Sequence, residues 1–335
     1  MLSTFCQVVN LGIVLSAYKF FRQMADALYA RDVYGKTLVE LGKLDSNIVV
    51  MDADLSGSTR TSLFGREFPE RFFNMGVAEQ NMMSTAAGLA SCGKIVFVST
   101  FSMFASARAL DQVRNSICYN NFNIKIVASH GGITVGEDGS SHQALEDISF
   151  MRSIPEMKVV VPCDAYETKD AVTSAYKEKG PFYIRLGRAK IPVLEGRKKF
   201  EVGKGYILEE GKDIAIIACG LMVHNAKKAL DLLRKDKITP ILANIHTVKP
   251  IDEELILNIA KRVKGIVVCE EHSIIGGLGS AVCEVLSENC PVLVKRVGTR
   301  DRFGQSGIPS ELIKAYNLDS EDIANAAKEL YGKFR

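Results

Sequence analysis

Short apolar runs alternate with longer amphipathic segments along most of the chain. We expect buried strands in NIVVMDAD (47–54), KIVFVSTF (94–101), NIKIVASHGG (123–132), MKVVVPCD (157–164) and PFYIRLGR (181–188). We expect helices at 78–93, where Gly93 is a C-terminal cap, at 102–119 and at 165–180. The strands are continuously apolar, which is typical of a parallel sheet with helices on both faces.

The alternation of apolar runs and amphipathic segments stops at residues 189–212, which are rich in charged residues, Gly and Pro. It resumes after residue 212. Strands are expected at 213–220, 239–248, 265–272 and 292–298, and helices at 225–236, 252–263, 279–288 and 320–333. The sequence therefore predicts an α/β protein with two doubly wound domains in tandem. The first spans 24–190, a linker spans 191–204, and the second spans 205–335.

Residues 1–23 are apolar but are interrupted by Gln7, Asn10 and Lys19. They lack the basic start and cleavage site of a signal peptide, and they are too interrupted for a membrane span. We interpret them as an N-terminal extension of uncertain structure, with the native start at Met24. A packed extra element is the alternative.

Composition narrows the class of protein further. The formal charge is only +3, and its basic residues are evenly spread, which gives no support for nucleic-acid or membrane binding. The eight cysteines are scattered without metal-ligand spacing, so we expect a reduced, cytoplasmic protein without disulfides or zinc.

Chemically distinctive residues follow the strands of the first half, where open α/β sheets bind ligands. Polar, basic and aromatic side chains come directly after four of the strands: Asp52, Asp54, Phe101, Phe104, His130, Arg185 and Arg188. A long glycine-rich loop, 132–147, adds His142 and several acids. The pattern favours a functional site along this edge, although loop polarity alone could explain the loop's residues.

The GGLG turn at 276–279 could hold an anion, but a tight turn is the favoured interpretation.

One acid stands out because its neighbours are apolar. Glu79 lies in FFNMGVAEQNMM (72–83), where an ionised carboxylate is costly unless something pairs with it. The chain also lacks a P-loop, a dinucleotide fingerprint, and the GDG-plus-Asn pattern that holds Mg²⁺ and diphosphate in thiamine diphosphate enzymes. The residues alone leave the partner of Glu79 open, and the chain has no diphosphate cradle of its own.

Two long segments, FFNMGVAEQNMMSTAAGLASCGKIVFVSTFSMFASARALDQVRNSICY and ASHGGITVGEDGSSHQALEDISFMRSIPEMKVVVPCD, carry a family resemblance. They resemble transketolase, in its pyrimidine-binding domain followed by its C-terminal domain, and the resemblance covers residues 24–335. The diphosphate-binding domain that precedes these two in single-chain transketolases is absent. The chain thus looks like the C-terminal subunit of a split transketolase.

The resemblance implies roles for individual residues. Glu79 and His142 are the implied catalytic residues, with His142 near the reacting carbonyl. Glu79 would contact N1′ of the cofactor's aminopyrimidine, so the resemblance implies that the partner of Glu79 comes from outside this chain. The implied cofactor-binding residues are Glu79, Phe101, Phe104, Asp54 and Val77. The implied substrate-binding residues are Arg31, Ser58, His130, Asp138, His142 and Arg188. The family often has a tyrosine where this chain has Ala107.

The resemblance also implies the activity and its partners. It implies reversible transfer of a two-carbon ketol unit between sugar phosphates in the pentose phosphate pathway. This chain would bind the pyrimidine end of thiamine diphosphate. An N-terminal transketolase subunit would bind its diphosphate with Mg²⁺ or Ca²⁺, in an α₂β₂ heterotetramer where this chain dimerises. No metal site is expected in this chain.

Other protein families share parts of this pattern and are alternatives to transketolase. Deoxyxylulose phosphate synthases and the β subunits of 2-oxo acid dehydrogenases share the two-domain arrangement. His130 disfavours the former, because that family usually has an Asp-Arg pair in place of SHGG. The GEDG loop with His142 disfavours the latter. A transketolase for an unusual sugar or for formaldehyde, or a non-catalytic assembly protein that keeps the fold, are further alternatives.

Overall fold

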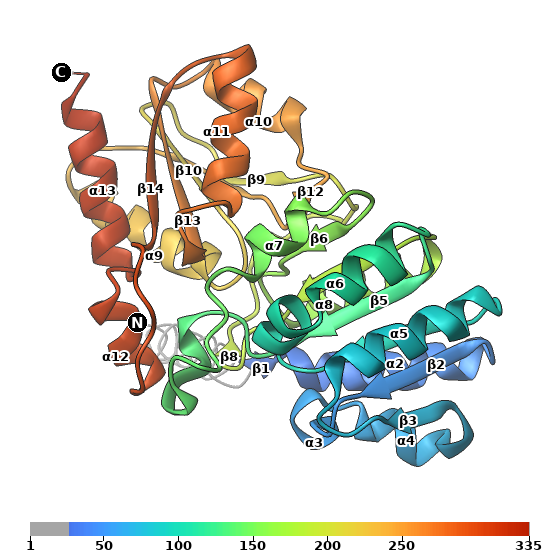
Figure 1. The fold of residues 1–335 in the computed structure, drawn as a ribbon. Coiled ribbons are helices and arrows are strands. Elements are labelled where there is room, and N and C mark those ends of the chain that lie inside the picture. The colour runs from blue at the N-terminus through green and yellow to red at the C-terminus, as the bar shows by residue number, and fades with distance from the viewer. Residues whose placement is uncertain (1–26, 335) are drawn as a thin grey trace, which may run out of the picture.

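The computed structural model describes residues 27–334, and the extension predicted at 1–23 lies outside them. A seven-stranded sheet is built mainly from the first half of the chain, in the order β12-β6-β7-β5-β4-β2-β3 (Figure 1). Its strands are β2 (Ile48–Asp52), β3 (Phe72–Asn74), β4 (Ile95–Ser99), β5 (Ile124–Ala128), β6 (Lys158–Val160), β7 (Phe182–Arg185) and β12 (Thr247–Lys249). All are parallel except β12, which pairs antiparallel with β6.

A five-stranded sheet forms the second half, in the order β14-β13-β10-β11-β9. Its strands are β9 (Tyr206–Glu209), β10 (Ala215–Ala218), β11 (Ile241–Asn244), β13 (Gly265–Ser273) and β14 (Leu293–Thr299). Only β9 runs antiparallel to its neighbour. A short ribbon of β1 (Leu28–Tyr29) and β8 (Lys190–Ile191) completes the strands of the described residues.

Helices cover both faces of each sheet. In the first half these are α2 (Ala30–Leu44), α3 (Ser56–Thr59), α4 (Ser62–Glu67), α5 (Glu79–Ser91), α6 (Leu110–Gln112), α7 (Asp147–Ser153) and α8 (Ala165–Lys177). In the second half they are α9 (Met222–Lys235), α10 (Glu253–Ala260), α11 (Leu278–Asn289), α12 (Pro309–Ala315) and α13 (Ser320–Gly332). The predicted α/β class, with covered parallel sheets, is confirmed.

Strand β2 shows how the apolar runs produce this architecture. Ile48 and Val50 point into the core under α2 and α8, whereas Val49 and Met51 point into the core under α5. Both sets are buried because successive side chains of a strand point to opposite faces. The core under α5 continues into the second half through Ile217 and Ile245, so one hydrophobic core joins the two sheets.

Two predicted elements differ from the structure. The strand expected at 239–248 is divided between the two sheets as β11 and β12. The division falls where Ile245 donates its amide to Ala218 and the His246 carbonyl accepts from Val161. An apolar run cannot show which sheet its strand joins.

The helix expected at 102–119 contains π-helical turns at Phe104–Arg108 and Val113–Cys118, a feature that often accompanies functional sites.

His246, at the crossover between the sheets, makes folding sensitive to acid. Its ring stacks on Phe200 at 4.3 Å, and burial lowers the pKa of His246 to about 4. The unfolded chain binds this proton near pH 6.5, so stability is lost as pH falls from there toward 4. We expect His246→Phe to reduce the fall in unfolding free energy between pH 7 and 4.5, measured by urea titration at several pH values. An unchanged slope in the variant would contradict this role.

Candidate active site

The carboxyl ends of β7, β5, β4 and β2 are neighbours in the first sheet, and the aromatic residues after them are in contact. Phe101 stacks on His130 with ring centroids 3.8 Å apart. Phe104 meets the edge of His142 at 5.2 Å and lies 6.0 Å from Phe101. The order of the strands therefore brings together residues that are distant in the sequence. Phe101 and His142, for example, lie 41 positions apart.

Glu79 begins α5, and its partner is in this chain. Arg108 Nη1 donates to both carboxylate oxygens of Glu79, at 2.9 and 2.8 Å. The guanidinium of Arg108 also lies over the ring of Phe104, 4.2 Å from its centroid. The expectation that the partner comes only from outside the chain is wrong in this structure, because a nearby cation satisfies the buried acid.

Sequence reasoning missed Arg108 although a signal was present. Arg108 follows Phe104 by four residues, a spacing that places both side chains on one face of a helical segment. Nothing in the local pattern links that face to Glu79, 29 positions earlier. The contact arises because the segment 104–118 packs against α5. Tertiary packing, not spacing, supplies the pair.

A cluster of basic groups surrounds His130. Burial and the nearby charges of Arg31 and Arg188 lower the pKa of His130 to about 3, so its imidazole stays neutral at physiological pH. Burial and Arg60 also lower the pKa of Arg31. Cations that depress one another's protonation in this way form a region where a bound anion is stabilising.

Arg31 and Arg188 approach this cluster from different elements. Arg31, in α2, donates weakly to the Ser58 carbonyl at 3.4 Å, and its buried Nε has no partner among the described residues. Arg188 follows β7 and donates to the carbonyl of Val135 and to Glu137, the latter at 2.7 Å. An unpaired guanidinium N–H is a donor suited to a phosphate oxygen.

The loop after β2 carries two further predicted residues, Asp54 and Ser58. Asp54 has φ +63° and exchanges two hydrogen bonds with Asn74, at 2.9 and 3.1 Å. Asp52, in contrast, is an anchor of the loop, since its carboxylate accepts from Thr59, Thr61 and the Leu55 amide. The loop's shape is thus fixed from within.

Val77 and Asp138 lie on the surface of the chain. Val77, just ahead of α5, is 72% exposed, which is unusual for a large apolar side chain. Asp138 is exposed at the end of the 3₁₀ turn Ile133–Asp138, four residues before His142. A hollow of about 470 Å³ opens beside the same loop, lined in part by Met103, Ser140 and Phe303.

Arg185 lies at the predicted edge but is a structural residue. It is 5% exposed and donates to Asp147 at 2.7 Å and to the carbonyls of Ala144 and Glu271, each at 3.0 Å. Glu271, from β13, in turn accepts from the Thr134 amide at 2.7 Å. The second half of the chain therefore holds the loop that carries His142.

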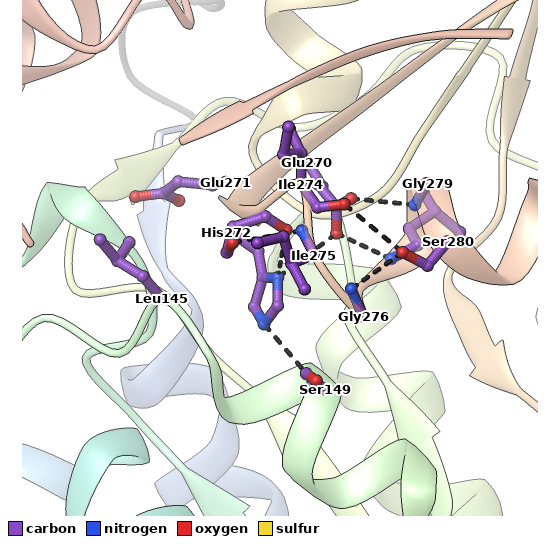
Figure 2. Close-up of polar contacts among 12 residues, drawn as sticks. Leu145, Ser149, Glu270, Glu271, His272, Ile274, Ile275, Gly276, Gly279 and Ser280 are labelled. Atoms are coloured by element: carbon purple, nitrogen blue, oxygen red, sulfur yellow. Dashed lines mark hydrogen bonds and ion pairs between the residues drawn. The ribbon is translucent and has the colours of Figure 1, made fainter. Parts of the chain in front are cut away.

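Figure 2 shows how β13 meets α11 and α7. The carboxylate of Glu270 accepts from the amides of Leu278 and Gly279, at 2.7 and 2.9 Å, so it occupies the helix N-terminus at the GGLG turn. His272 points to Ser149, whose amide donates to Nε2 at 3.4 Å. A side chain at Gly277 would collide with Glu270, so the turn serves close packing.

The described residues place limits on other functions. They contain no group of three or more His, Cys, Asp or Glu side chains placed to hold a metal ion. Within the same part of the chain, no helix combines the length and apolar character needed to cross a membrane. The seven cysteines that the structure describes are all free.

Family models match both halves of the chain. Residues 26–193 match the transketolase pyrimidine-binding domain, and residues 203–323 match the transketolase C-terminal domain. The chain belongs to the transketolase family. A putative transketolase C-terminal section from Methanocaldococcus jannaschii is 52% identical over 89% of this chain and 95% of that protein. The transketolase family implies thiamine diphosphate as cofactor.

Two further relatives of this transketolase family member are informative. The 6-deoxy-6-sulfo-D-fructose transketolase subunit SqwH from Clostridium sp. is 42% identical over 90% of this chain and 94% of that subunit. A solved structure described as a split gene transketolase, inactive beta4 tetramer, has a TM-score of 0.83 and 47% identity. It matches 91% of this chain and 99% of that chain. This chain is therefore similar along its length to subunits of split transketolases.

The residues at the sheet edge fit the pyrimidine end of that cofactor. Aromatic faces at Phe101 and Phe104 can stack against a planar ring, and the Glu79 carboxylate can accept a hydrogen bond from a ring nitrogen. The sheet edge therefore has the chemistry to hold an aminopyrimidine ring.

Proposed function

We propose that this chain is the C-terminal subunit of a thiamine diphosphate-dependent transketolase, which transfers a two-carbon ketol unit from a ketose phosphate to an aldose phosphate. One observation carries the proposal: Arg108 bridges the Glu79 carboxylate and the Phe104 ring, at the sheet edge where His130, His142 and Arg31 gather. The reaction is that of the pentose phosphate pathway, in the cytoplasm.

Each residue has a physical role in this proposal. Thiamine diphosphate, when bound, supplies the electron sink for the carbon–carbon chemistry. Glu79 exchanges a proton with ring nitrogen N1′, and Phe101, Phe104 and Val77 hold the ring, with Asp54 beside it. His142 polarises the donor carbonyl. Neutral His130 donates one N–H to the substrate phosphate and does not contribute charge.

Charge for the substrate phosphate comes from Arg31 and Arg188, with Ser58 as a further donor, and Asp138 accepts from a donor hydroxyl. The diphosphate and its Mg²⁺ or Ca²⁺ belong to an N-terminal subunit. Two copies of each chain form the active α₂β₂ assembly, with this chain dimerising. The exposed Val77 supports this arrangement, because the other subunit and the cofactor would cover it.

The test is a two-component assay. The full chain is mixed with the diphosphate-binding subunit that copurifies with it, thiamine diphosphate and Mg²⁺, and is supplied with a ketose phosphate and an aldose phosphate. We expect two-carbon transfer only when both chains are present, and weak cofactor binding by this chain alone. A mixture that binds the cofactor yet transfers nothing would exclude the proposal, and so would tight stoichiometric binding by the isolated chain.

Replacing either arginine of the basic cluster is expected to weaken substrate binding selectively. Arg31→Ala or Arg188→Ala removes charge-assisted hydrogen bonds to the phosphate, worth about 1.5–3 kcal/mol, which corresponds to a KM increase of about 10-fold or more. Steady-state kinetics with phosphorylated and unphosphorylated sugars measures this. A fall in kcat with unchanged KM would contradict the role, and Arg234→Ala, far from the cluster in α9, is the control.

Phosphorylated and sulfonated sugars are both candidate substrates of the proposed enzyme. The similar SqwH subunit is described as acting on a sulfonated sugar, and a phosphate-binding cluster of arginines also suits a sulfonate. Comparing kcat/KM for phosphorylated and sulfonated ketoses in the assay above decides between these substrates. Formaldehyde as acceptor is tested in the same assay.

A further inference from the structure

We propose that Arg108 is a latch that closes over Glu79 and must swing away before the cofactor's aminopyrimidine can bind, an inference that rests on the proposed function. The observation behind it is a contrast in exposure within one ion pair. The side chain of Glu79 is 1% exposed and that of Arg108 is 45% exposed. The arginine is the cover and the acid is what it covers.

The guanidinium of Arg108 occupies the positions that the ring needs. It is planar, it lies over the face of Phe104, and it donates N–H to both oxygens of Glu79. An aminopyrimidine is also planar, stacks on an aromatic face and needs an oxygen of the same carboxylate. With Glu79 almost inaccessible, the ring cannot reach it while the guanidinium is in place.

The latch is free to open because little else holds it. The contacts described for the Arg108 side chain are those to Glu79 and Phe104, whereas its backbone carbonyl is fixed by Gln80 at 3.0 Å. The side chain can therefore rotate into solvent without moving the helical segment. Ala107, also exposed, leaves room beside it. Closure keeps the buried acid paired whenever the cofactor is absent.

Closure has a cost in cofactor affinity. A state that cannot bind reduces the apparent affinity by the fraction of molecules that are open. If about one molecule in ten is open, removing the latch raises the affinity about 10-fold. Arg108→Gln is the informative variant, because it keeps a polar side chain but loses the charged planar group and its reach.

The first measurement needs no cofactor. Carboxyl groups of the full chain are labelled with a carbodiimide and an amine, and the modified residues are quantified by mass spectrometry. We expect slow labelling of Glu79 in the wild type and at least 5-fold faster labelling in Arg108→Gln. The size of this effect follows from an open fraction of about one in ten, because only open molecules expose the carboxyl group. Arg114→Gln, an exposed change in the same helical segment, is the control, and buried Glu270 reports any general unfolding.

The second measurement uses the assembled two-chain enzyme and thiamine diphosphate. We expect faster association and tighter binding in Arg108→Gln than in the wild type. Equal labelling of Glu79 in both proteins, or weaker cofactor binding by the variant, would overturn the latch, and the latter would make Arg108 a residue that holds the ring. Failure of the wild-type assembly to bind the cofactor would refute the proposed function, whereas the labelling result would still decide whether Arg108 covers Glu79.

Discussion

Changing Glu79 to glutamine is expected to leave the chain folded and to lower kcat of the assembled enzyme by about 10²–10⁴-fold, the range for loss of a general acid–base group. Glutamine keeps the size of the side chain and offers both an N–H donor and an oxygen acceptor, so a hydrogen bond with a ring nitrogen can still form. An amide cannot take up and return the proton, so the exchange that the carboxyl provides is lost.

The variant also separates chemistry from folding. Glu79 is buried, but its partner Arg108 is half exposed and can turn to solvent when the charge is removed. We therefore expect a loss in unfolding free energy of about 1 kcal/mol or less, as for exposed ion pairs. Glu67→Gln, which breaks the exposed pair with Lys43, is the matched control and should keep full activity. Near-normal turnover by Glu79→Gln would overturn its assignment.

Much of the fold follows from the pattern of apolar runs. Strands such as 95–99 and 124–128 are buried on both faces, and an uninterrupted apolar run has this meaning in a parallel sheet. The pattern could not predict which of the two sheets a given strand joins. The run at 239–248 reads as one strand despite Asn244 and His246, and only tertiary contacts determine that its end joins the sheet of the other half.

The candidate site was predictable to a similar depth. Strand ends indicated Phe101 and His130, which the structure places in stacking contact. The same reasoning could not distinguish Arg185 from Arg188, because both follow one strand. Burial separates them, since Arg185 faces buried carboxylates and Arg188 lies near the surface. Sequence shows that a charge is present, and the fold decides whether it is paired inside.

The largest expected loss of stability comes from Arg185→Met. This change leaves Asp147 and Glu271 buried without their shared cation. Removing one partner of a buried ion pair typically costs about 3–5 kcal/mol. Urea unfolding of the full chain measures this loss, and Arg234→Met, which breaks exposed pairs, should cost about 1 kcal/mol or less. A loss for Arg185→Met as small as that of the control would contradict a structural role.

A double-mutant cycle shows whether the pair itself is responsible. Asp147→Asn alone should also be destabilising, because it weakens the bonds from Arg185 and from the Tyr183 hydroxyl, each 2.7 Å long. In the double variant no pair remains to be broken, so we expect a cost smaller than the sum of the two single changes. Arg185 also donates to the carbonyl of Ala144, which lies in the same loop as His142. The single Arg185 variant should therefore lose activity at temperatures where it is still folded, because the loop that places His142 has lost its anchor.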